Sequence, residues 1–108
     1  MLKNNFRNIL SKRMQVDIND AYEIEKYWVL EADLLSKNID ETIHFLENEC
    51  TADEFVFVSE VFEEVAKETQ SREFIECLWR VAKKFPNECK KYNIAFFIQD
   101  AQEQLKDA

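Results

Sequence analysis

Apolar residues recur at every third or fourth position along most of this chain, the spacing that places side chains on one face of an α-helix. In the first half this pattern predicts three helices. The first carries Leu2, Phe6, Ile9 and Leu10, the second Ala21, Ile24, Trp28, Ala32 and Leu35, and the third Ile43 and Leu46. The second begins after the segment 17–20 and the third at Asn38 or Asp40, because Asp and Asn side chains accept hydrogen bonds from the free N–H groups of a first turn.

A longer helix is predicted over residues 51–68. Thr51 and Glu54 form a T-x-x-E capping box, in which each side chain bonds the backbone N–H of the other residue. The apolar stripe of this helix is Phe55, Val58, Phe62 and Val65. On a continuous helix, Asp53, Glu60, Glu63 and Glu64 lie on the opposite side. The segment therefore combines a core face with a strongly acidic outer face.

Two further helices are predicted in the last third of the chain. Ser71 caps the first, and its stripe is Phe74, Cys77, Leu78, Val81 and Phe85. Ile75, Trp79 and Ala82 widen that stripe to about half the helix circumference, so we expect this helix to pack on two sides. It ends before Pro86, a turn covers 86–91, and Asn93 starts a last helix carrying Ile94, Phe97, Ile98, Ala101 and Leu105.

These elements predict an all-α fold. The short connections favour antiparallel neighbours, so we expect residues 1–108 to form a single compact domain of about five to six short antiparallel helices. The arrangement is either an irregular bundle or a short stack resembling helical repeats. The composition agrees, because the chain has no glycine and one proline. Phosphate-binding loops and tight hairpin turns depend on glycine, so nucleotide-binding α/β folds and all-β folds are disfavoured.

The distribution of apolar residues and cysteines predicts a cytoplasmic protein. No apolar run is long enough to span a bilayer, and the first residues lack the apolar core of a secretory signal peptide. The three cysteines, Cys50, Cys77 and Cys89, are an odd number without C-x-x-C spacing. This usage is typical of reduced thiols in a reducing compartment.

The net charge of −8 is concentrated in the middle of the chain, where residues 16–68 hold 16 acidic and three basic residues. Such a field repels nucleic acid and anionic membrane and attracts a basic protein surface. The four bases of residues 1–15 can pair with this acidic middle. The bases of residues 72–91 are diluted by acids and fit helix C-termini better than a nucleic-acid patch.

Acidic residues of the middle segment are the candidate partner-binding surface. No Lys or Arg lies between Lys37 and Lys67, although solvated helix faces normally mix charges of both signs. On this helix Phe57 lies beside Glu60 and Glu64. An apolar residue bordered by carboxylates is typical of a protein-binding surface. The candidate partner-binding residues are Asp40, Glu41, Glu47, Asp53, Phe57, Glu60, Glu63, Glu64 and Tyr22. The alternatives are an ordinary solvated face and a Phe57 covered by another helix.

Catalytic chemistry is not predicted. His44 is the only histidine, and with Cys50 it could suggest a nucleophile and base or two metal ligands. A third partner at a suitable spacing and a glycine-bearing oxyanion loop are both missing. We therefore expect a non-enzyme without catalytic residues, a metal site or a cofactor.

The stretch "CTADEFVFVSEVFEEVAKETQSREFIECLWRVAKKFP" resembles the helical immunity proteins of contact-dependent growth inhibition and related polymorphic toxin systems. The chain lacks the paired-tyrosine segment of colicin-nuclease immunity proteins, so no residue is transferred from that family. The resemblance implies stoichiometric inhibition of a cognate toxin domain, often a nuclease with a basic surface, through an acidic helical surface. The alternative function is a helical adaptor that binds a partner in an apolar groove around Ile75, Trp79 and Ala82.

Overall fold

Helices joined by short connections account for nearly all of residues 2–106, which the computed structural model describes. The first half contains α1 (Leu2–Met14), α2 (Ala21–Lys37), α3 (Ile39–Asn48) and α4 (Ala52–Val58). The second half contains the 3-10 helix η1 (Ser59–Val61), then α5 (Phe62–Thr69), α6 (Arg72–Lys84), α7 (Pro86–Tyr92) and α8 (Ile94–Glu103). The all-α class is confirmed, and the number of helices exceeds the five to six expected.

The predicted caps begin four of these helices. Asp20, Asn38 and Ser71 each accept a hydrogen bond from the backbone N–H three residues later. Thr51 and Glu54 form the full capping box at the start of α4, with both reciprocal bonds present. Each such cap stabilises a helix by about 1 kcal/mol, because it satisfies an N–H group that the helix itself leaves free.

Two helices end at a left-handed residue, although the chain has no glycine for this role. Gln70 closes α5 with φ 52°, and Asn93 separates α7 from α8 with φ 57°. The Gln70 side chain bonds the carbonyls of Lys67 and Gln104 and accepts the N–H of Lys106. These contacts hold Gln70 in a conformation that glycine usually supplies.

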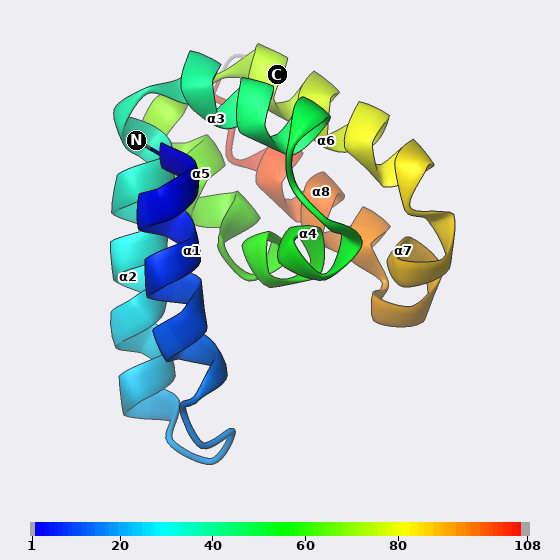
Figure 1. The fold of residues 1–108 in the computed structure, drawn as a ribbon. Helices are drawn as coiled ribbons and strands as arrows, with labels where there is room; N and C mark the ends of the chain where they lie inside the picture. Colours follow the sequence, from blue (N-terminus) through cyan, green and yellow to red (C-terminus); the bar gives the residue numbers. More distant parts are fainter. Residues whose placement is uncertain (1, 107–108) are drawn as a thin grey trace.

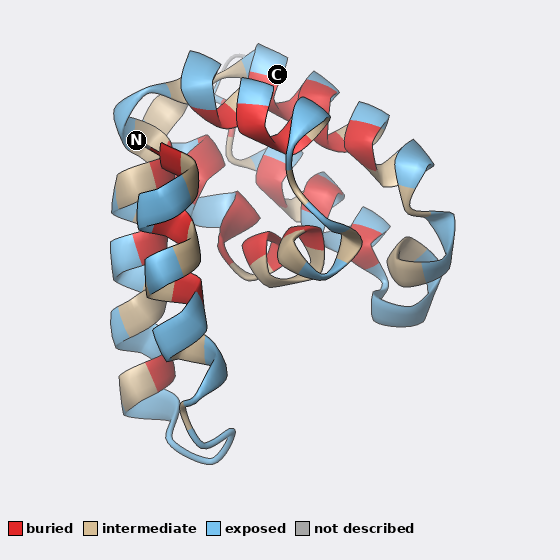
Figure 2. Cartoon of the chain, viewed as in Figure 1, coloured by how far each residue is buried: buried red, intermediate tan, exposed pale blue. Residues whose placement is uncertain are grey.

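Figure 1 shows α1 and α2 side by side as a long hairpin, with the remaining helices grouped beside its upper part. Within that group α5 packs against α8, and α6 packs against both α3 and α8, as its wide apolar stripe predicts. Buried residues line the helix faces that point toward one another, and the far end of the hairpin is mostly exposed (Figure 2). The Cα radius of gyration is 13.0 Å, close to the value of about 13 Å for a compact domain of 100 residues.

Phenylalanine rings from different helices meet in the core. The ring of Phe62 lies 5.4 Å from that of Phe55 and 6.4 Å from that of Phe74, and Phe55 also contacts Phe85 at 6.0 Å. Phe55, Phe62 and Phe74 are fully buried. Burial of each such ring contributes roughly 1.5–3 kcal/mol, so this cluster helps to hold α4, α5 and α6 together.

The continuous helix predicted over 51–68 is wrong, because the chain bends between α4 and α5 (Figure 1). The Ser59 hydroxyl donates to the Val56 carbonyl, the next turn tightens to 3-10 geometry, and Val61 leaves helical angles at φ −121° and ψ 12°. In a straight helix, residues seven apart are separated by about 10 Å along the axis. The bend allows the rings of Phe55 and Phe62 to meet instead.

The turn predicted over 86–91 is also wrong, since these residues form α7. Pro86 ends α6 as expected, but it is then the first residue of the next helix. Proline suits that position, because its missing N–H would have no partner there and its φ angle is already helical.

Candidate functional site

Several of the predicted acidic contact residues are engaged within the molecule. Glu41 accepts the backbone N–H of Leu2 at 2.9 Å. Glu47 pairs with the guanidinium of Arg80 on α6, and its carbonyl accepts a bond from Lys84. These contacts fasten α1 and α6 to α3, so Glu41 and Glu47 have a structural use in this fold.

Within residues 2–106, three of the four bases of the N-terminal helix pair with the acidic middle of the chain, as predicted, and Lys12 does not. Lys3 lies 2.9 Å from Glu49, and Arg7 binds both carboxylate oxygens of Glu54 at 2.6 and 3.0 Å. Burial raises the pKa of Glu54, but the bonds from Arg7 and Thr51 outweigh this effect and leave that pKa below its usual value. The helix α1 therefore compensates part of the negative charge of residues 40–60.

Glu60 turns inward, which contradicts the outer face expected from a continuous helix. Its carboxylate binds Arg13 of α1 at 2.8 and 3.3 Å and accepts the indole N–H of Trp28 of α2 at 3.0 Å. The bend at η1 makes this possible, because it rotates Glu60 away from Glu63 and Glu64. Glu60 thus joins α1, α2 and η1.

Phe57 is half-buried and packs against the hydrophobic core. The guanidinium of Arg13 lies 5.6 Å from the centre of its ring. This cation–π contact covers one face of the Phe57 ring, which was predicted to contact a partner. Phe57 is therefore not the exposed anchor ringed by carboxylates that was expected.

The remaining predicted residues are exposed but do not form one surface. Asp40 lies on α3, Asp53 on α4 and Tyr22 on α2, whereas Glu63 and Glu64 are neighbours on α5. Tyr22 is 79% exposed and belongs to the α1–α2 hairpin. Of this set, only Glu63 and Glu64 lie within a larger concentration of negative charge.

That concentration is completed by α8, which packs against α5. Partial burial and the charges of Asp100, Glu64 and Glu103 raise the pKa of Glu63 above its usual value. These four carboxylates form no ion pair within residues 2–106. Within the described residues, no ion pair offsets the repulsion among them.

Exposed aromatic residues adjoin this cluster. Phe96 is 59% exposed. It lies one turn before Asp100 and two turns before Glu103, on the same side of α8. Phe97, which the sequence pattern placed in the core stripe, is 41% exposed beside it. We call this surface the acidic–aromatic face. It consists of Glu63, Glu64, Phe96, Phe97, Asp100 and Glu103.

Two of these six residues, Glu63 and Glu64, were predicted from the sequence. The signal for these two was the base-free run, which ends before α8. The four residues on α8 gave a separate signal, since two adjacent aromatic residues and two acids occupy a ten-residue helix. The buried stripe of α8 consists of Ile94, Ile98 and Ala101. Phe96, Asp100 and Glu103 lie outside this stripe, so the helical periodicity of the sequence could have identified them as surface residues.

His44 and Cys50 do not form a nucleophile and base. The His44 ring contacts the Asn48 amide at 3.2 Å, whereas the Cys50 thiol donates to the Leu46 carbonyl. Burial, followed by the charge of Glu54, raises the pKa of Cys50 to about 12. A thiol with this pKa stays protonated at neutral pH and is a poor nucleophile.

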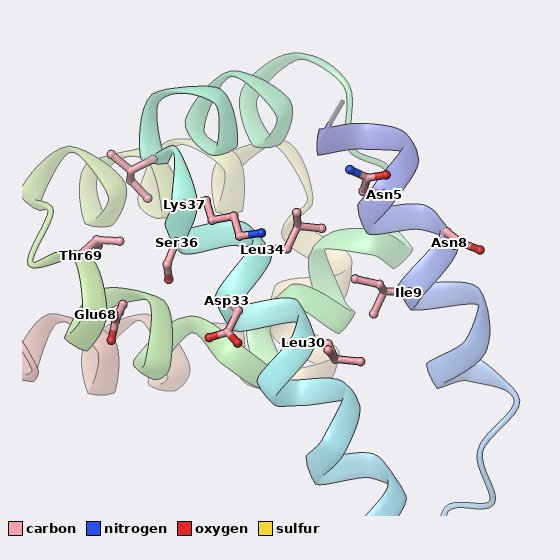
Figure 3. A pocket seen from close by; sticks show the side chains of 11 residues that line it. Asn5, Asn8, Ile9, Leu30, Asp33, Leu34, Ser36, Lys37, Glu68 and Thr69 are labelled. Carbon is pink, nitrogen blue, oxygen red and sulfur yellow. The ribbon is translucent and has the colours of Figure 1, made fainter.

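An open groove of about 870 Å³ runs along α2. Figure 3 shows Asn5, Asn8 and Ile9 on one side of α2 and Glu68 and Thr69 on the other. Leu30, Asp33 and Lys37 of α2 lie between these two groups. Because the polar groups do not converge on one point, this groove lacks the features of a specific small-molecule site.

The apolar groove considered for an adaptor is largely filled. Ile75 is buried, and Trp79 and Ala82 are half-buried against the core. A depression of about 350 Å³ remains beside Trp79, lined also by Arg72, Ile75, Glu76, Gln102 and Leu105.

Comparison with known proteins found no matching protein family, no similar curated protein and no similar solved structure. Within residues 2–106, no helix has the length and apolar character needed to cross a membrane. The same residues contain no group of three or more His, Cys, Asp or Glu side chains arranged to hold a metal ion. The acidic–aromatic face is therefore the candidate functional site that the geometry supports best.

Proposed function

We propose that this protein is a non-catalytic binding protein that recognises a basic protein surface through its acidic–aromatic face. The observation that carries the proposal is the cluster of Glu63, Glu64, Asp100 and Glu103 on two packed helices, in which partial burial and then the three neighbouring charges raise the pKa of Glu63. A basic partner would relieve this repulsion. The long-range field of the cluster would also speed the encounter, since complementary charge steers association.

Phe96 and Phe97 give the face the aromatic contact area that carries binding energy in many protein interfaces. Both are more than 40% exposed and border the carboxylates. Exposed aromatic rings beside carboxylates suit a specific complex, because burial of the rings slows dissociation while the charges steer approach.

The finer proposal is an immunity protein that acts in the cytoplasm on a cognate toxin domain, in keeping with the resemblance of residues 50–86. It inhibits by stoichiometric binding that covers the basic surface of the toxin, without a cofactor or any catalytic step. The net charge of −8 supports the binding role, and His44 and Cys50 are each engaged by a local hydrogen bond, to Asn48 and to the Leu46 carbonyl.

The test is co-expression with the toxin domain encoded by the adjacent upstream gene. Cells that express this chain should survive the toxin, and the two purified proteins should form a 1:1 complex. Survival should be lost when Glu64 and Glu103 are both replaced by Lys. It should be retained when Glu25 and Asp33, two exposed acids of α2, are replaced in the same way. Absence of a complex with the wild-type chain would refute the immunity function.

A further inference from the structure

Glu31 is a carboxylic acid whose side chain is fully buried in the α1–α2 hairpin. It lies on α2, its exposed fraction is 0%, and neither of its side-chain oxygens has a hydrogen-bond partner within the described residues. A buried carboxylate without bonds is costly, whereas the neutral acid is much less so. Its burial therefore favours the protonated form.

The neighbours of Glu31 form the network that joins the α1–α2 hairpin to η1. Trp28 lies one turn before it on the same side of α2 and donates to Glu60, which also binds Arg13. The pKa of Glu31 is raised to about 7, chiefly by burial and secondly by the charge of Glu60, while Arg13 lowers it.

The charges that act on Glu31 therefore come from η1 and α1. Two other helices, α3 and α5, also pack against α2. Asp40 and Glu41 of α3 follow the C-terminal end of α2, beyond Lys37. Glu68 of α5 lies across the groove from Asp33 and Lys37, as Figure 3 shows.

We propose that Glu31 makes the closure of the α1–α2 hairpin on η1 pH-dependent. While Glu31 holds its proton, Arg13 is bound by Glu60 alone and the network is complete. When the proton leaves to water, two carboxylates compete for one guanidinium, the Trp28–Glu60 bond weakens, and the hairpin loosens from η1. This inference does not depend on the proposed function.

The sign of the linkage follows from the raised pKa. The folded protein holds this proton more tightly than the unfolded chain, so the contribution of Glu31 to stability is complete below its unfolded pKa of 4.5. It is lost as the pH rises through about 7. Across this window the folded-to-unfolded ratio falls roughly 300-fold.

The test measures the indole N–H resonance of Trp28 by NMR and urea unfolding between pH 5 and 9. The wild-type resonance should shift with a midpoint near pH 7, whereas that of Trp79 should not follow it. Glu31→Gln should abolish both this midpoint and the associated loss of stability. Glu25→Gln, on the exposed side of α2, should change neither.

Two further variants keep the result decisive. His44→Gln removes the only histidine and should leave the midpoint in place. Glu31→Met, an apolar side chain of similar length, serves if Glu31→Gln does not fold. A wild-type protein without a midpoint between pH 6 and 8, or the same midpoint in both Glu31 variants, would overturn the proposal.

Discussion

Replacement of Arg13 by Met should destabilise the fold more than its position near the end of α1 suggests. Arg13 donates twice to Glu60 and lies over the ring of Phe57, and its side chain is only 12% exposed. Met keeps the aliphatic stem but removes the charge. The variant therefore isolates the contribution of the guanidinium to the docking of the α1–α2 hairpin on η1.

The magnitude follows from the contacts that are lost. Hydrogen bonds to charged groups contribute about 1.5–3 kcal/mol, and a cation–π contact adds about 0.5–1 kcal/mol. The Glu60 side chain is 27% exposed, so water recovers part of this loss. We expect a net loss of about 2 kcal/mol from a total stability of about 5–15 kcal/mol, and a fall in Tm of roughly 9 °C for a chain of this length.

Urea unfolding at pH 7, followed by circular dichroism, measures this loss. Lys12→Met is the matched control, because Lys12 is exposed on the same turn and forms no ion pair within residues 2–106. It should change stability by less than about 0.5 kcal/mol. If Arg13→Met and Lys12→Met unfold at the same urea concentration, Arg13 does not fasten the hairpin and the reasoning fails.

Three other variants or reactions test separate parts of the fold. Phe62→Ala should lower the free energy of unfolding in urea by about 3–5 kcal/mol, because it opens a cavity in the ring cluster. Phe96→Ala should lower this free energy little, and equal losses in the two variants would contradict the assigned core. Thr51→Ala removes the capping box of α4 and should lower the free energy of unfolding by about 1 kcal/mol. An unchanged unfolding midpoint would show that the capping box does not contribute to stability. Burial raises the pKa values of Cys50 and Cys77 to about 12. In the folded protein at pH 8 these thiols should therefore react with a disulfide reagent roughly a thousandfold more slowly than in the chain unfolded by urea. Fast labelling of the folded chain would contradict their burial.

The helices that could be predicted from the sequence are those whose ends depend on local bonds. Asp20, Asn38, Thr51 and Ser71 each bond a backbone group three residues away, so the signal and the structure lie in the same short segment. Pro86 was ambiguous, because the same residue stops one helix and starts the next.

The bend at η1 could not be found in this way. It accompanies contacts of Glu60 with Arg13 and Trp28, which are 47 and 32 residues away in the sequence. A helical wheel assumes that Glu60, Glu63 and Glu64 share one face, and the bend separates them. The acidic–aromatic face was incomplete for the same reason, since it depends on the packing of α5 against α8.

Titration of the partner that the proposed function expects, a toxin domain encoded by an adjacent gene, with matched charge-reversal variants tests the central claim most directly. Glu64→Lys with Glu103→Lys, on the acidic–aromatic face, should weaken binding at least tenfold and reduce its dependence on salt between low and physiological ionic strength. Glu25→Lys with Asp33→Lys changes the net charge equally and should leave the affinity within about threefold of the wild type. Equal weakening by both pairs would mean that net charge alone attracts the partner, and unchanged affinity in the first pair would place the interface elsewhere.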